Sequence, residues 1–123
     1  MLDHAGFGVS DYQRSRSFYE QALAPLGIEV VMELADRQVL FGRGGKPFFV
    51  VGVRYPPAKG AVHIAFAAED RASVDAFHAA GLAAGGTDNG APGVREVYHP
   101  NYYGAFVLDP DANNIEAVCH KPA

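Results

Sequence analysis

The chain has 123 residues, 49% of them hydrophobic, and a formal net charge of −4 at pH 7, which is the composition of one globular domain. Its ten Lys and Arg residues are scattered, which argues against a nucleic-acid partner, and Cys119 is the only cysteine, which excludes an intrachain disulfide. No apolar run approaches the roughly 20 residues of a membrane span and the first residues do not resemble a secretory signal, so we expect a cytoplasmic protein without membrane contact.

Residues 2–9 predict a first strand, because apolar residues alternate there with small or polar ones. Ala5, Phe7 and Val9 form the apolar row, which we expect to pack on a helix. Successive side chains of a strand point to opposite faces. His4 is therefore expected on the other face of the sheet, beside glycines that leave room around it.

A helix is predicted next. Ser10 and Asp11 supply an N-cap, and Ser10 with Gln13 matches the capping-box pattern. Gly27 is well suited to the left-handed conformation that ends a helix. Three strands are expected after it, at residues 28–33, 37–42 and 47–53. A first module of strand, helix and three strands therefore covers about residues 1–53, followed by a proline-containing linker at 54–60.

The sequence after the linker repeats the sequence before it. At an offset of 59 positions, residues 2–27 align without a gap on residues 61–86, with seven identities in 26 positions. His4 aligns with His63, and the cap residue Asp11 aligns with Asp70. Further strands are predicted near residues 94–99, 103–108 and 114–120. A repeat at one fixed offset predicts two copies of one unit, so we expect an α+β fold of two βαβββ modules, the second at about 61–121.

Three side chains stand out as candidate metal ligands. His4 and His63 occupy equivalent places on corresponding strands, and Glu116 lies between apolar neighbours in the last strand. A carboxylate among apolar residues is costly to bury without a partner or a metal. Two histidines and one glutamate on one sheet face would form a facial triad with open metal positions. The alternative is that the histidines are ordinary half-buried residues and Glu116 is a solvated side chain.

These features resemble the vicinal oxygen chelate superfamily, the group of glyoxalases, bleomycin-resistance proteins and extradiol dioxygenases. The resemblance spans both modules and is carried by the following residues: His4, Asp11 to Tyr19, Gly27, His63, and Phe106 to Glu116 with its Asp109-Pro110-Asp111-Ala112-Asn113 turn. It implies a curved, mostly antiparallel eight-stranded sheet around a cavity, with the helices outside. It also implies a homodimer, and a divalent ion (Zn, Ni, Mn or Fe) held by His4, His63 and Glu116 that chelates adjacent oxygens of a small-molecule substrate.

Two departures from the family pattern affect what is expected. Phe49 stands where the glyoxalase I pattern has a fourth protein ligand, if Glu116 is laid opposite it in the repeat. The remaining His-His-Glu set resembles that of the extradiol dioxygenases, and weak or absent glyoxalase I activity follows. Ala112 replaces a glycine common in the turn before the last strand, so we expect Asn113 to take the left-handed conformation.

The function predicted on this basis is that of a metal-dependent lyase, isomerase or dioxygenase. The residues expected to line the substrate cavity are Phe49, His99, Tyr102, Tyr103 and His120. The alternative is a metal-free protein that binds a small molecule or sequesters an antibiotic, in which Phe41, Phe49 and Tyr103 would line an apolar cleft. A third possibility is a domain that serves only in association.

Overall fold

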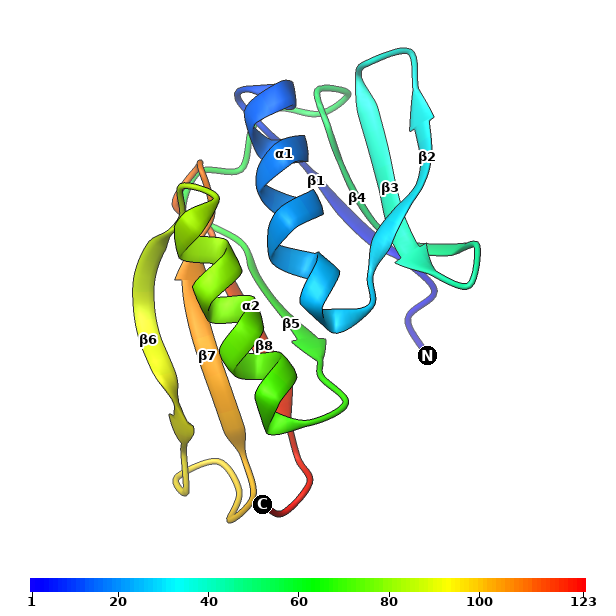
Figure 1. The fold of residues 1–123 in the computed structure, drawn as a ribbon. Helices are drawn as coiled ribbons and strands as arrows, with labels where there is room; N and C mark the ends of the chain where they lie inside the picture. The colour runs from blue at the N-terminus through cyan, green and yellow to red at the C-terminus, as the bar shows by residue number, and fades with distance from the viewer.

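The computed structural model describes residues 1–123 and consists of two βαβββ modules (Figure 1). Module one contains β1 (Ala5–Gly8), α1 (Tyr12–Leu23), the 3-10 helix η1 (Ala24–Leu26), β2 (Glu29–Leu34), β3 (Gln38–Arg43) and β4 (Lys46–Gly52). Module two contains β5 (His63–Ala67), α2 (Arg71–Ala83), β6 (Thr87–Val94), β7 (Tyr103–Leu108) and β8 (Asn114–Cys119). The predicted α+β class and the predicted repeat of one βαβββ unit are confirmed.

The eight strands form two four-stranded sheets of the same topology. Their orders are β1-β4-β3-β2 and β5-β8-β7-β6. In each sheet the first strand pairs in parallel with the last, and the other pairs are antiparallel. The curved sheet is therefore divided between the modules rather than hydrogen-bonded throughout, and β1 and β5 are each an edge strand.

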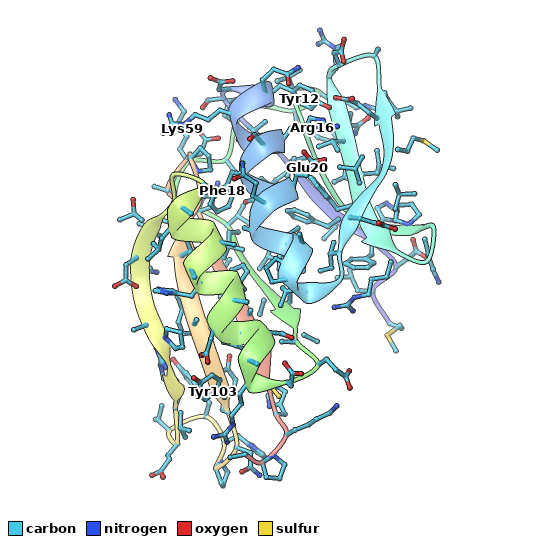
Figure 2. All side chains as sticks on the ribbon, in the orientation of Figure 1. Tyr12, Arg16, Phe18, Glu20, Lys59 and Tyr103 are labelled. Atoms are coloured by element: carbon cyan, nitrogen blue, oxygen red, sulfur yellow. The ribbon has the colours of Figure 1, made fainter.

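The two helices pack together in front of the sheets in Figure 1. A single cluster of 20 buried residues draws on both modules. Phe18 of α1 is fully buried and lies between the helices (Figure 2), and the rings of Phe49 and Phe66 join β4 to β5 with their centroids 5.1 Å apart. Neither helix has the length and apolar character to cross a membrane. Because the helices cover one face of each sheet, functional side chains are to be sought on the opposite faces.

A buried polar turn also links the modules. The Tyr19 hydroxyl of α1 donates to Asp109 Oδ2 at 2.5 Å, and burial raises the pKa of Tyr19 well above its usual range, with Asp109 adding to the effect. Ser10 donates its amide and its hydroxyl to Asp111 in the same turn. The capping-box prediction was therefore wrong, because Asp11 alone caps α1 by accepting from the Arg14 amide at 3.1 Å.

The left-handed residue of this turn is Ala112, with φ at 64°, and not Asn113. Asn113 instead uses its side chain, which accepts from the amides of Ala61 and Val62 and donates to the carbonyl of Ala58. That binding ties the end of the linker to the turn. The expectation for Asn113 is corrected because its amide group has a long-range role that its sequence neighbours do not reveal.

Strand β6 lies seven residues earlier than predicted, at Thr87–Val94, and residues 95–99 belong to the following loop. Its glycine-rich sequence indicates a loop, but the segment forms a strand that pairs with β7 with irregular register. The Arg95 guanidinium completes the pairing by donating to the carbonyls of Ala91, Gly93 and Gly104. Tertiary pairing has thus overridden the weak local preference of glycine for a strand.

Candidate functional site

His63 and Glu116 come together on the open face of module two. They lie on the adjacent parallel strands β5 and β8, where His63 pairs with Asn114 and Ala65 with Glu116. His63 Nε2 lies 3.3 Å from Glu116 Oε1. The Glu116 side chain is only 2% exposed, whereas that of His63 is half exposed. Two of the three predicted ligands therefore meet, one at the surface and one beneath it.

One hydrogen bond of the His63 ring indicates which of its two nitrogens carries the hydrogen. Nδ1 lies 3.0 Å from the carbonyl oxygen of Asn114. A carbonyl can only accept, so Nδ1 carries the hydrogen and Nε2 of the neutral ring presents a lone pair to the carboxylate. Two acceptors 3.3 Å apart repel unless a positive charge lies with them. That charge is either a second proton on His63 or a bound cation.

Tyr102 forms a hydrogen bond with the other carboxylate oxygen of Glu116. Its hydroxyl donates to Glu116 Oε2. Burial, followed by this hydrogen bond, raises the pKa of Tyr102 well above its usual range, so the phenol remains protonated at neutral pH. The hydrogen bond holds the carboxylate in one orientation and leaves Oε1 directed at His63.

Aromatic rings surround this group. Phe106 of β7 stacks on the His63 ring, with centroids 6.5 Å apart. His120 packs edge-on against Tyr102 at 5.2 Å and against His99 at 5.8 Å. Of the predicted cavity residues, Tyr102 therefore contacts Glu116, His120 packs on Tyr102, and His99 packs on His120.

Tyr103 lies on the other side of the sheet and is not part of this group. Its hydroxyl donates to Asp75 of α2 at 2.6 Å, and the Arg71 guanidinium lies 4.9 Å from the centre of its ring. Figure 2 shows it beside the N-terminal end of α2. The structure does not bring Tyr103 to the group around Glu116, because successive residues of β7 face opposite sides and Tyr102 precedes the strand on the open side.

Phe49 also faces the helices, and it is not the counterpart of Glu116. The repeat equates Gly6 with Ala65; in the two parallel ladders Gly6 pairs with Val50 and Ala65 with Glu116. Val50 is therefore the residue that corresponds to Glu116. Phe49 is 1% exposed within the shared core. The predicted register was shifted by one residue, which in a strand exchanges one face for the other.

His4 does not join His63 and Glu116 within the chain. Its side chain is 67% exposed and its Nδ1 lies 2.8 Å from Asp3 Oδ1. It lines a pocket of about 340 Å³ on module one, whereas His63 lines a different pocket of about 450 Å³. No three His, Cys, Asp or Glu side chains of the chain are grouped so as to hold a metal ion.

The pair in module two nevertheless fits a divalent cation. Imidazole nitrogen and carboxylate oxygen are common ligands of such ions, at about 2.0–2.2 Å for zinc, so neighbouring ligands lie roughly 3 Å apart. The 3.3 Å between His63 Nε2 and Glu116 Oε1 agrees with that spacing. The carbonyl of Asn114 and the hydroxyl of Tyr102 supply the outer hydrogen bonds typical of metal ligands. The donor set is thus suitable and lacks a third protein ligand from the same chain.

Sequence reasoning missed three contributors to the two open faces. The Asn114 carbonyl leaves no signal, because any residue would provide it. Phe106 could have been found from alternation along its strand, which places it on the face opposite Tyr103. Arg54 lines the pocket of module one with His4, but its position in the predicted linker gave no indication of this.

Comparisons with known proteins agree with the fold. The sequence profile of the Glyoxalase/Bleomycin resistance protein/Dioxygenase superfamily matches residues 1–117. A crystal structure of a glyoxalase/bleomycin resistance protein from Albidiferax ferrireducens T118 is 32% identical, with a TM-score of 0.85 over 97% of this chain and 98% of that one.

More distant structures share the fold alone. Lactoylglutathione lyase from Agrobacterium tumefaciens is 21% identical, with a TM-score of 0.69 over 97% of this chain and 92% of that one. A glyoxalase/bleomycin resistance protein/dioxygenase family enzyme from Burkholderia phytofirmans PsJN is 18% identical, with a TM-score of 0.72 over 98% of both chains. A search of curated proteins found no match.

Proposed function

The chain belongs to the glyoxalase/bleomycin resistance protein/dioxygenase superfamily, and we propose that it is a metal-dependent enzyme acting on a small molecule, with His63 and Glu116 as ligands of a divalent ion. The observation that carries the proposal is the facing pair of acceptors, His63 Nε2 and Glu116 Oε1, 3.3 Å apart. Glu116 Oε1 needs a positive charge opposite it, which a second proton on His63 or a divalent cation supplies, and the outer hydrogen bonds orient both groups towards the same point.

The residues around the pair have separate tasks. When bound, the ion would act as a Lewis acid on two adjacent oxygens of the substrate, the chemistry that the family resemblance implies for a lyase, isomerase or dioxygenase. The Asn114 carbonyl keeps the hydrogen of His63 on Nδ1, and Tyr102 restrains Glu116. His99 and His120 lie beside Tyr102 and can accept or donate a proton at the substrate.

We infer that the third ligand is His4 of a second copy of the chain. His4 is exposed on the open face of module one, while His63 and Glu116 lie on the open face of module two. Edge strands such as β1 and β5 favour association between chains. A twofold dimer that sets module one of each copy against module two of the other would form two equivalent His-His-Glu sites, in line with the homodimer that the resemblance implies.

The first test measures metal affinity. Apo protein is titrated with Zn²⁺, Ni²⁺, Mn²⁺ and Fe²⁺ at fixed pH in competition with a chromophoric chelator, since protons compete for the ligands. His63→Ala and Glu116→Gln should each weaken the tightest-binding ion at least about tenfold, as a lost ligand costs no less than a lost outer hydrogen bond. His78→Ala is the matched control, because His78 pairs with Asp88 at 2.9 Å and not with Glu116. Equal affinity in wild type and His63→Ala would refute the proposed ligand set.

The second test asks whether the site is shared between chains. His4→Ala and His63→Ala proteins are each expected to bind metal poorly. When the two are unfolded together and refolded, a dimer containing one of each has one site with both mutations and one site with neither. Random mixing should therefore restore about a quarter of the wild-type sites. A site built within one chain would show no recovery, and a concentration-independent monomer mass in light scattering would also contradict the dimer.

A metal-free binding protein is the second candidate. The pocket of about 450 Å³ between β5 and module one favours it, because most of its lining is hydrophobic. The apolar residues of this lining include Leu2, Ala5, Phe48, Phe49, Ile64 and Phe66. Absence of measurable metal affinity, together with binding of an apolar dye that Ile64→Asp abolishes, would favour this second function.

A further inference from the structure

The open face of module one carries a pocket with a different chemistry from the site of module two. Its volume is about 340 Å³, at the lower end of the range for small-molecule sites. Its lining combines hydrogen-bond donors with two apolar surfaces, and the side chains that matter here are His4, Gln38, Val50, Arg54 and Tyr55. A lining that holds both hydrogen-bond donors and apolar side chains suits a small ligand with one polar and one apolar end.

The linker is held in place where it contributes Arg54 and Tyr55. The Ala58 amide donates to the Gly8 carbonyl at 2.9 Å. A Cβ at Gly8 would lie 2.3 Å from the carbonyl oxygens of Tyr55 and Pro56, so only glycine permits this approach. The backbone contact fixes the start of the linker against β1 and keeps the Arg54 side chain at the pocket.

Arg54 is a cation without an acidic partner. None of the ion pairs in the chain includes it, and its guanidinium carbon lies 5.9 Å from the ring centroid of Tyr55. The nearest carboxylate to His4, that of Asp3, is paired with His4 and lines the other two pockets rather than this one. All the N–H donors of the guanidinium are therefore available to a ligand.

We propose that this pocket binds the carboxylate of a small molecule, with Arg54 as its anchor and Gln38 as an additional donor. The planar guanidinium matches a carboxylate through two parallel hydrogen bonds. A guanidinium also pairs with phosphate, but inorganic phosphate has no apolar part to place against the hydrophobic side chains of this lining. Val50 and the Tyr55 ring face the apolar part of the ligand. If the bound molecule is the substrate, the inference rests on the proposed function, because the carboxylate would be one end of a molecule whose other end reaches the metal.

The test uses apo protein in the presence of a chelator, with benzoate as the probe. Amide chemical shifts of Gly6 and Gly52 are followed by NMR during titration with benzoate, the neutral analogue benzyl alcohol and inorganic phosphate. Benzoate should bind, benzyl alcohol should bind at least tenfold more weakly, and phosphate should not compete at equal concentration. Arg54→Gln should weaken benzoate at least tenfold, while Arg54→Lys should retain part of the affinity, because lysine keeps the charge without the planar fork.

Arg14→Gln removes the same charge from the exposed surface of α1 and should leave benzoate binding unchanged. Equal binding of benzoate by wild type and Arg54→Gln, or tighter binding of phosphate than of benzoate, would overturn the inference. His63→Ala should bind benzoate as wild type does, and the metal affinity of Arg54→Gln should equal that of wild type. The carboxylate pocket and the metal site can therefore each fail without the other.

Discussion

Glu116 is the residue where burial and charge conflict most directly. It is 2% exposed and lies between the buried residues Ile115 and Ala117. A carboxylate in such a place is stable only with partners for its oxygens, and Tyr102 and His63 take one oxygen each. Tyr102 donates to Oε2, whereas Oε1 faces His63 Nε2 and requires either a second proton on that nitrogen or a bound cation. A bound cation is the interpretation we favour.

Tyr102→Phe tests the restraint on Glu116. The change leaves Oε2 buried without its donor, so the free energy of unfolding of the apo protein should fall by about 1–3 kcal/mol. Metal affinity should fall about tenfold as the carboxylate loses its orientation. Urea unfolding and chelator competition measure the two effects. Tyr98→Phe is the control, because Tyr98 is 65% exposed and packs on Tyr102 without bonding Glu116. If the two variants behave alike, Tyr102 does not position the ligand.

Val50→Glu and Phe49→Glu together test the register of the first module. Val50 is half-buried on the open face and corresponds to Glu116, so a glutamate there should be tolerated and should tighten metal binding by adding a carboxylate beside His4. Phe49→Glu should prevent folding at 37 °C, because it buries a charge in the shared core at a cost of several kcal/mol. Circular dichroism and chelator competition distinguish them. Folded Phe49→Glu protein with tighter metal binding would reverse the assignment.

At the scale of the element, the turn between β7 and β8 shows a residue in an unfavourable conformation. Ala112 has φ at 64°, where an L-residue with a Cβ costs about 1–2 kcal/mol more than in a right-handed conformation. The turn tolerates this because Asp109 accepts from the amides of Asp111 and Asn113, and its amide donates to the Asn113 carbonyl. The hydrogen bonds of the turn thus hold a backbone that Ala112 disfavours.

Ala112→Gly should therefore stabilise the protein. The relief of the left-handed alanine exceeds the extra entropy that glycine adds to the unfolded chain, and a net gain of about 0.5–1 kcal/mol is expected. Ala76→Gly is the control, since Ala76 is exposed in the middle of α2 and the same change there should cost about 1 kcal/mol. Chemical denaturation of both variants measures whether each change raises or lowers the free energy of unfolding. A loss of stability in Ala112→Gly would mean that strain is absent at this position.

At the scale of the whole molecule, the two modules are joined by apolar and polar contacts together. The shared core crosses between them, and the buried hydrogen bond from Tyr19 to Asp109 connects α1 with the last turn of module two. Asp109 is 5% exposed, so water cannot replace the donor. We therefore expect the modules to unfold as one unit, in a single transition.

Tyr19→Phe tests this connection. It should lower the free energy of unfolding by about 1–3 kcal/mol while keeping one transition, because the lost hydrogen bond connects the two modules. Tyr12→Phe is the matched control, at a tyrosine that also lies on α1 (Figure 2). Its hydroxyl donates to Glu33 at 2.6 Å within module one. Because Glu33 is exposed, the loss in the free energy of unfolding should stay below about 1 kcal/mol. Thermal unfolding followed by circular dichroism measures both. Separate transitions in Tyr19→Phe would show that the modules are energetically independent.

The sequence alone determined what depends on local pattern. The 59-residue offset predicted two equivalent modules, the apolar neighbours of Glu116 marked it as a candidate ligand, and Gly27, with φ at 75°, ends the first helical segment as expected. These signals are local because strand alternation, caps and left-handed turns are properties of a few consecutive residues. They were sufficient for the fold and for naming His4, His63 and Glu116 as candidate metal ligands.

Only the tertiary structure decided which residues meet across the chain. Whether Phe49 or Val50 corresponds to Glu116 depends on a parallel register between distant strands, and a shift of one residue exchanges the faces. Strand β6 forms from a glycine-rich segment because β7 and the Arg95 side chain pair with it. His4 and His63 are equivalent in the repeat yet line separate pockets. Long-range pairing and packing, unlike alternation, leave no pattern within a short window of sequence.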